Sequence, residues 1–116
     1  ILKNRLVNCD EDGVDYEGDD GRIEGNKISY VGAGIDYYGD NPTIVKNKVV
    51  GAENDGIDVT CFVCSGGLVT KNKVRYVVGD DDCFDVHVEG SDPNDPNAPT
   101  APPTNPFLIE GNSAGD

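Results

Sequence analysis

The stretch IEGNKISYVGAGIDYYGD, residues 23–40, contains two phrases that recur along the chain and decide its fold. The first phrase, an aliphatic residue followed by two others and an asparagine, returns as ILKN (1–4), IVKN (44–47), VTKN (69–72) and IEGN (109–112). The second phrase, GIDY at 34–37, returns as GVDY (13–16), GIDV (56–59) and CFDV (83–86). Two linked phrases that repeat at about 20 to 25 residues are typical of a solenoid, in which each repeat is one supersecondary unit.

The repeating unit is built of strands. Apolar side chains alternate strictly in the second phrase, as in Ile35 and Tyr37 or Ile57 and Val59, and no stretch has the 3.6-residue period of a helix. We therefore predict an all-β parallel β-helix (β-solenoid) of about four full coils plus a partial fifth. Stacking the repeats predicts two buried columns, Val14, Ile35, Ile57 and Phe84, and Leu6, Ile28, Val49 and Val74.

The recurring asparagines are predicted to have a structural role. They are spaced 22, 21, 25 and 40 residues apart, and a catalytic residue would not recur once per coil. At a bend, stacked side-chain amides can hydrogen-bond up and down the axis. The predicted ladder comprises Asn4, Asn26, Asn47, Asn72 and Asn112.

The chain is expected to be one β-helix domain, residues 1–116, with a Pro-rich loop at residues 88–107 inserted between coils. Proline cannot donate to a strand ladder, so this segment should leave the coil. Six of the seven prolines lie there: Pro93, Pro96, Pro99, Pro102, Pro103 and Pro106.

Charge is sorted along each repeat, although the net charge is −13. Phosphates would be repelled by such a chain, so we expect no nucleic-acid partner, and no apolar run is long enough for a membrane span. A basic stripe should lie beside the asparagines. It is either a solvated surface that resists aggregation, or a surface for lateral pairing of molecules or for an anionic polysaccharide. Seven of the nine basic residues form it: Lys3, Arg5, Lys27, Lys46, Lys48, Lys71 and Lys73.

Four cysteines allow three fully paired connectivities. Cys61 and Cys64 are close enough in sequence for an intramolecular disulfide, whereas Cys9 and Cys83 should lie three coils apart, about 14 Å along the axis. Cys9 and Cys83 are therefore expected to be free or to pair between molecules. The absence of methionine and the Pro-rich, acidic composition favour an extracellular or cell-surface protein.

The outward aspartates of the second phrase should stack about 4.8 Å apart. Like charges that face each other destabilise a sheet, and such a column is relieved by binding cations or by raised pKa values. We expect calcium as the one candidate cofactor, since it prefers hard oxygen ligands. Its candidate ligands are Asp15, Asp36, Asp58 and Asp85.

The two phrases resemble the repeats of right-handed parallel β-helix proteins of the pectin-lyase-like superfamily, and the resemblance implies the right-handed coil. NDGIDV at 54–59 and GDDDCF at 79–84 are similar to two phrases of polygalacturonases. That likeness implies Asp55, Asp81 and Asp82 as general acid and base for glycoside hydrolysis. The histidine-glycine phrase and the basic substrate-binding phrase of that family are missing.

The sequence thus favours a structural or surface-binding module over a self-sufficient enzyme. We expect an extracellular β-solenoid that stacks end to end with copies of itself into a filament, or acts as a matrix element. The alternatives are a fragment of a polysaccharide hydrolase or lyase, and a calcium-dependent glycan-binding module.

Overall fold

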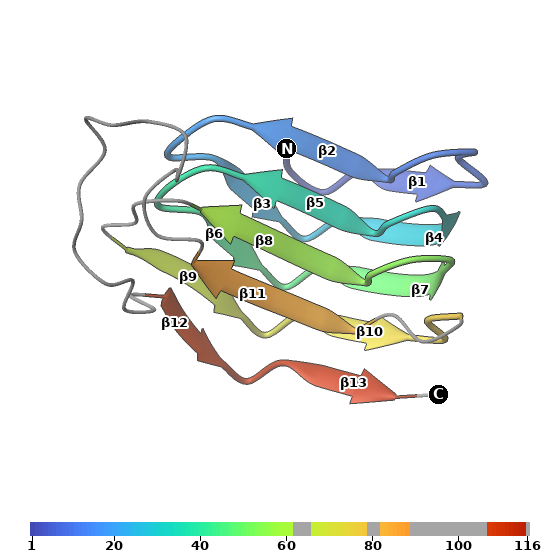
Figure 1. The fold of residues 1–116 in the computed structure, drawn as a ribbon. Coiled ribbons are helices and arrows are strands. Elements are labelled where there is room, and N and C mark those ends of the chain that lie inside the picture. Colours follow the sequence, from blue (N-terminus) through green and yellow to red (C-terminus); the bar gives the residue numbers. More distant parts are fainter. Residues whose placement is uncertain (62–65, 79–81, 89–106, 116) are drawn as a thin grey trace.

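The computed structural model describes residues 1–61, 66–78, 82–88 and 107–115, and all of its elements in those ranges are β-strands (Figure 1). The strands pair in parallel and form three sheets, which confirms the predicted all-β solenoid. The first sheet contains β1 (Arg5–Val7), β4 (Lys27–Val31), β7 (Lys48–Ala52), β10 (Lys73–Arg75) and β13 (Ser113–Gly115). The second contains β2 (Val14–Glu17), β5 (Ile35–Tyr38), β8 (Ile57–Cys61) and β11 (Phe84–Val88). The third contains β3 (Arg22–Glu24), β6 (Thr43–Val45), β9 (Gly67–Thr70) and β12 (Phe107–Glu110).

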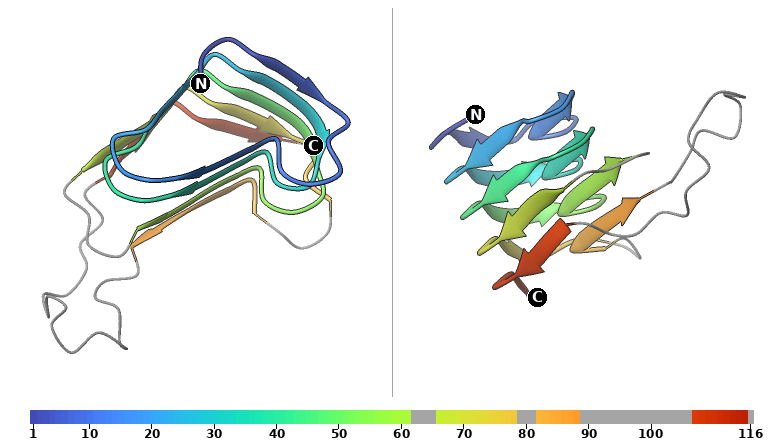
Figure 2. Two further views of the ribbon diagram at one scale, coloured as in Figure 1. Left: turned by 90° about the horizontal axis from the view of Figure 1, so that it is seen from above. Right: turned by 90° about the vertical axis from the view of Figure 1, so that its left-hand side faces the viewer.

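Consecutive strands visit the three sheets in turn, so each coil has three sides. Viewed from the N-terminal end, the chain turns clockwise as it recedes, which is a right-handed coil (Figure 2). The stack makes about 3 turns, slightly fewer than the predicted four and a partial fifth. Residues 79–81 and 89–106, which include most of the predicted Pro-rich loop, are outside the described ranges.

The interior is filled by the predicted columns of aliphatic side chains. Val14, Ile35, Ile57 and Phe84 are in register across the second sheet, and Leu6, Ile28, Val49 and Val74 across the first. In the inner coils these side chains are completely buried, as are Ile23, Ile44 and Val69 of the third sheet. Burial of apolar side chains on all three sides of the coil is the main stabilising contribution to this fold.

Main-chain conformation also repeats once per coil. The residue before each ladder asparagine has a left-handed conformation, with φ between 52° and 69°, whether it is lysine or glycine. The bend needs this conformation to turn the chain from the third sheet into the first, and glycine meets the need without the steric cost that a Cβ atom brings. The five positions are Lys3, Gly25, Lys46, Lys71 and Gly111.

A tyrosine pair closes the bend between the second and third sheets. The rings of Tyr16 and Tyr37 stack with centroids 5.0 Å apart and planes 13° apart. Tyr37 is buried, and its hydroxyl accepts a hydrogen bond of 2.9 Å from the N–H of Gly21 and donates one of 3.0 Å to the carbonyl of Asp40. Burial raises the pKa of Tyr37, so this hydroxyl stays neutral and able to donate.

Described residues include no helix long and apolar enough to cross a membrane.

Candidate functional site

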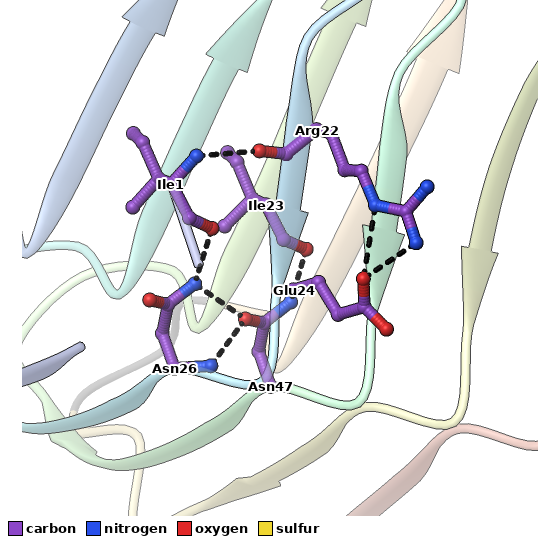
Figure 3. Close-up of polar contacts among 6 residues, drawn as sticks. All are labelled: Ile1, Arg22, Ile23, Glu24, Asn26 and Asn47. Carbon is purple, nitrogen blue, oxygen red and sulfur yellow. Dashed lines mark hydrogen bonds and ion pairs between the residues drawn. The ribbon is translucent and has the colours of Figure 1, made fainter. Parts of the chain in front are cut away.

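The five asparagines form a hydrogen-bonded ladder along the bend between the third and first sheets. Figure 3 shows two of its members, Asn26 and Asn47. The Asn47 amide shows the pattern: its nitrogen donates to the Ile23 carbonyl at 2.9 Å and to Oδ1 of Asn72 at 3.0 Å. Its own Oδ1 accepts from the main-chain N–H and the side-chain nitrogen of Asn26. Every polar atom of the buried amide is therefore used within the fold, which leaves none of them available for chemistry.

The aspartates proposed for catalysis lie at a turn that repeats. Oδ1 of Asp55 accepts a hydrogen bond of 2.9 Å from the main-chain N–H of Asp82, in the next coil. Two coils earlier in the stack, Oδ1 of Asp12 accepts an equal bond from the N–H of Ala33. The side chain of Asp55 thus has a turn-forming role that its counterpart Asp12 shares. Asp81 lies outside the described residues.

The outward aspartates of the second sheet are in register, Asp15 with Asp36, Asp36 with Asp58, and Asp58 with Asp85. Burial raises the pKa of Asp36, and the negative charges of Asp12, Asp15 and Asp55 raise it further. The described residues contain no group of three or more His, Cys, Asp or Glu side chains placed to hold a metal ion. The calcium prediction therefore rests on the sequence alone.

The cysteines divide into two kinds. Cys9 and Cys83 are half-buried free thiols, in separate coils. Cys61 is disulfide-bonded, and Cys64 lies outside the described residues.

The outer face of the first sheet has a different character from the acidic remainder of the molecule. Strand register brings one cation from each of four successive coils into a single column, which we call the cation column: Arg5, Lys27, Lys48 and Lys73. All four side chains are exposed. Among the described side chains none of the four has a carboxylate within 4.0 Å, whereas Arg22 pairs with Glu24 at 2.6 Å. Neighbouring charges about 4.8 Å apart repel by about 1 kcal/mol even in bulk water, so the column is electrostatically uncompensated.

A shallow groove lies along this column. Its volume is about 300 Å³, and it is lined by Arg5, Lys27, Ser29, Lys48 and Val50. Ser29 and Val50 are register partners, two residues beyond Lys27 and Lys48 on β4 and β7. The groove therefore has cations from three coils on one side and a floor that offers a hydroxyl and an apolar surface.

Next to Ser29 and Val50 on the same outer face lies a column of left-handed strand residues that interrupt the alternation of inward and outward side chains; we call it the bulge column. Tyr30 has φ 56°, so Ser29 and Tyr30 both face outward and the alternation resumes with Val31 inward. The register stays one to one across this position, because Ser29 pairs with Val50 and Val31 pairs with Ala52, which sets Tyr30 opposite Gly51. The bulge positions, all with positive φ, are Asn8, Tyr30, Gly51 and Tyr76.

The basic residues of this face were predicted from the sequence, but its tyrosines were not. Tyr30 and Tyr76 are 64% and 57% exposed, the most exposed aromatic side chains of the described residues. The available signal was Gly51, which occupies the same repeat position and marks it as left-handed.

Comparisons with known proteins add no relative: no family model, curated protein or solved structure matches this chain.

Proposed function

We propose that this chain is a structural β-solenoid module that binds a linear polyanion on the outer face of its first sheet. The observation that carries the proposal is the cation column: four exposed positive charges, one per coil, without described carboxylate partners, on a chain of net charge −13. Bound anionic groups would relieve the mutual repulsion of the column, and the acidic remainder of the molecule would direct a polyanion to this face.

The spacing of the column favours an extended polymer with one anionic group per repeat. Coils rise by about 4.8 Å, so a chain that runs parallel to the solenoid axis meets one cation per coil. Double-stranded DNA carries a charge about every 1.7 Å along its axis and would leave most of its phosphates without a partner here. An anionic polysaccharide fits the requirement, in keeping with the expectation from the sequence.

The test compares two double variants that remove equal charge. Lys27→Gln/Lys48→Gln removes the middle of the cation column, and Lys46→Gln/Lys71→Gln removes two lysines from the neighbouring bend. The probe is poly-L-glutamate, measured by calorimetry at low ionic strength. We expect the first variant to weaken binding about tenfold or more, and the second to weaken it much less. Binding that is absent in the parent protein, or equally weakened by both variants, would contradict the proposal.

We further propose that the protein is extracellular or lies at the cell surface. The disulfide bond of Cys61 supports it, because disulfides persist in oxidising compartments. We also propose membership in the pectin-lyase-like superfamily, for which the repeated phrases are the support.

Coaxial self-association is a second candidate. Ile1 and Ile109 are 47% and 43% exposed, whereas the residues between them in the same column, Ile23, Ile44 and Val69, are fully buried. Apolar surface at the first and last coil is a natural docking surface for another β-layer, from further chain or from a second copy. Sedimentation velocity over a range of concentrations tests this, and a monomer at every concentration would argue against it.

An enzymatic role is the rival to both. It requires Asp55 and Asp82 to act on a glycosidic bond, and it predicts loss of polygalacturonate cleavage when either is replaced. We expect no cleavage by the parent protein.

A further inference from the structure

We propose that the bulge column makes the groove a carbohydrate site, in which the ring of Tyr30 packs against a sugar whose acidic group is held by Lys27. The inference rests on the proposed function and narrows it from a polyanion of any kind to an acidic polysaccharide. Tyr76 provides a second ring, two coils further along the axis.

The first observation in support is the arrangement of outward side chains on β4. Lys27, Ser29 and Tyr30 all face outward from one strand, because the left-handed conformation of Tyr30 interrupts the alternation. Lys27 and Tyr30 are three residues apart, so about 7 to 10 Å separate them along the strand. A sugar ring with a carboxylate spans such a gap, with the carboxylate toward Lys27 and the ring toward Tyr30.

The second observation in support is the position of the Tyr30 ring. A Cβ atom built on Gly51 would lie 3.1 Å from Cδ1 of Tyr30, so the ring lies across the main chain of the next coil. Since Gly51 has no side chain, the ring is not enclosed from that side and stays 64% exposed. The ring thus lies beside the main chain of the next coil and remains accessible for stacking on the apolar face of a sugar.

The third observation in support is the distance between Tyr30 and Tyr76 along the solenoid axis. Tyr76 occupies the bulge position two coils from Tyr30, which is about 10 Å along the axis. Both rings can therefore contact one polymer that runs parallel to the axis, at alternate sugars. The cation column meets the same polymer once per coil, so the two columns require the same orientation of the ligand.

The experiment uses two probes that share their charge but not their chemistry. Alginate is a linear polysaccharide with one carboxylate per sugar, and poly-L-glutamate has one carboxylate per residue but no sugar ring. Affinities are measured by calorimetry for the parent protein, Tyr30→Ala, Tyr30→Phe and Asn8→Ala. The last variant is the control for change at a bulge position, and a thermal melt of each variant verifies the fold.

We expect Tyr30→Ala to weaken alginate binding about threefold to tenfold, the range for loss of one ring contact, while binding of poly-L-glutamate is unchanged. Tyr30→Phe keeps the ring and should keep the affinity, and Asn8→Ala should have no effect. If Tyr30→Ala leaves alginate affinity unchanged, or weakens both probes equally, the inference is overturned while the proposed function stands. If neither probe binds the parent protein, the proposed function fails as well.

Discussion

The main-chain N–H of Asp82 donates a 2.9 Å hydrogen bond to Oδ1 of Asp55, one coil earlier in the stack. Asp12 makes the equivalent bond to Ala33. An acceptor that recurs at the same place in different coils belongs to the architecture of the turn. Asp55 is half-buried there, so loss of its carboxylate would leave a main-chain donor without its partner.

We therefore expect Asp55→Ala to lower the free energy of unfolding by about 1 kcal/mol, and Asp12→Ala to have a similar effect. Asp55→Asn keeps Oδ1 as an acceptor and should be nearly neutral. Urea denaturation of the three variants measures this. A catalytic role without a structural one would instead leave the stability of Asp55→Ala unchanged.

Replacing an inner rung of the ladder should be costly. Asn47→Ala removes all four hydrogen bonds of that amide and leaves the main-chain N–H of Asn26 and one hydrogen of its side-chain amide without their acceptor. We expect a loss of about 3 kcal/mol or more, since each buried unsatisfied group costs about 1 to 3 kcal/mol. The control is Asn4→Ala at the exposed first rung, whose loss should be about 1 kcal/mol. Equal losses would mean that burial does not set the strength of the ladder.

The left-handed residue before each asparagine offers a stabilising substitution. Lys46 has φ 57°, at a position where the ladder elsewhere has Gly25 or Gly111. Lys46→Gly should raise the free energy of unfolding by about 0.5 to 1 kcal/mol because it removes the steric cost of the Cβ atom. Lys48→Gly removes the same charge two residues later, inside β7, and should lower stability by a similar amount. Two changes of the same sign would refute the conformational explanation.

The aspartate column predicts a pH dependence. Burial and neighbouring carboxylates raise the pKa of Asp36 in the folded protein above its ordinary value of 3.8, so the ionised group destabilises the fold. This destabilisation is complete above the folded pKa and disappears as the pH falls below the unfolded value. Asp36→Asn should therefore stabilise the protein at about pH 7, by about 0.5 to 1 kcal/mol, and have little effect at about pH 3.

Thermal melts of Asp36→Asn and the parent protein at the two pH values measure the difference. The matched control is Asp15→Asn in the outermost coil of the same column, where the side chain is exposed. A gain for Asp36→Asn that is larger at acidic pH would contradict the sign of this argument. The same melts with calcium and with a chelator test the calcium prediction, which an unchanged melting temperature would contradict.

Much of this fold was predictable because the sequence pattern that specifies it repeats once per coil. The columns through Ile35 and Ile28 follow from residue type and spacing alone, since register in a solenoid repeats with the sequence. The predicted count of coils was slightly too high. The exposed face was predicted only in part: Lys27 and Lys48 were found, but Tyr30 was not. An outward tyrosine beside an outward serine breaks strand alternation, and the cause is a φ angle that residue type does not specify.

Each inner asparagine amide contacts three consecutive coils, because its nitrogen donates to a carbonyl of the preceding coil and to the amide of the following one. Solenoids are usually described by nearest-neighbour coupling, in which any interface between repeats can open independently of the next. Opening of one interface here removes half of the hydrogen bonds that orient an amide, and the same amide also bonds across the neighbouring interface, which is thereby weakened. Unfolding should therefore advance inward from the ends as a single cooperative front, and amide protons of β4 and β7 should exchange with solvent at nearly the same rate.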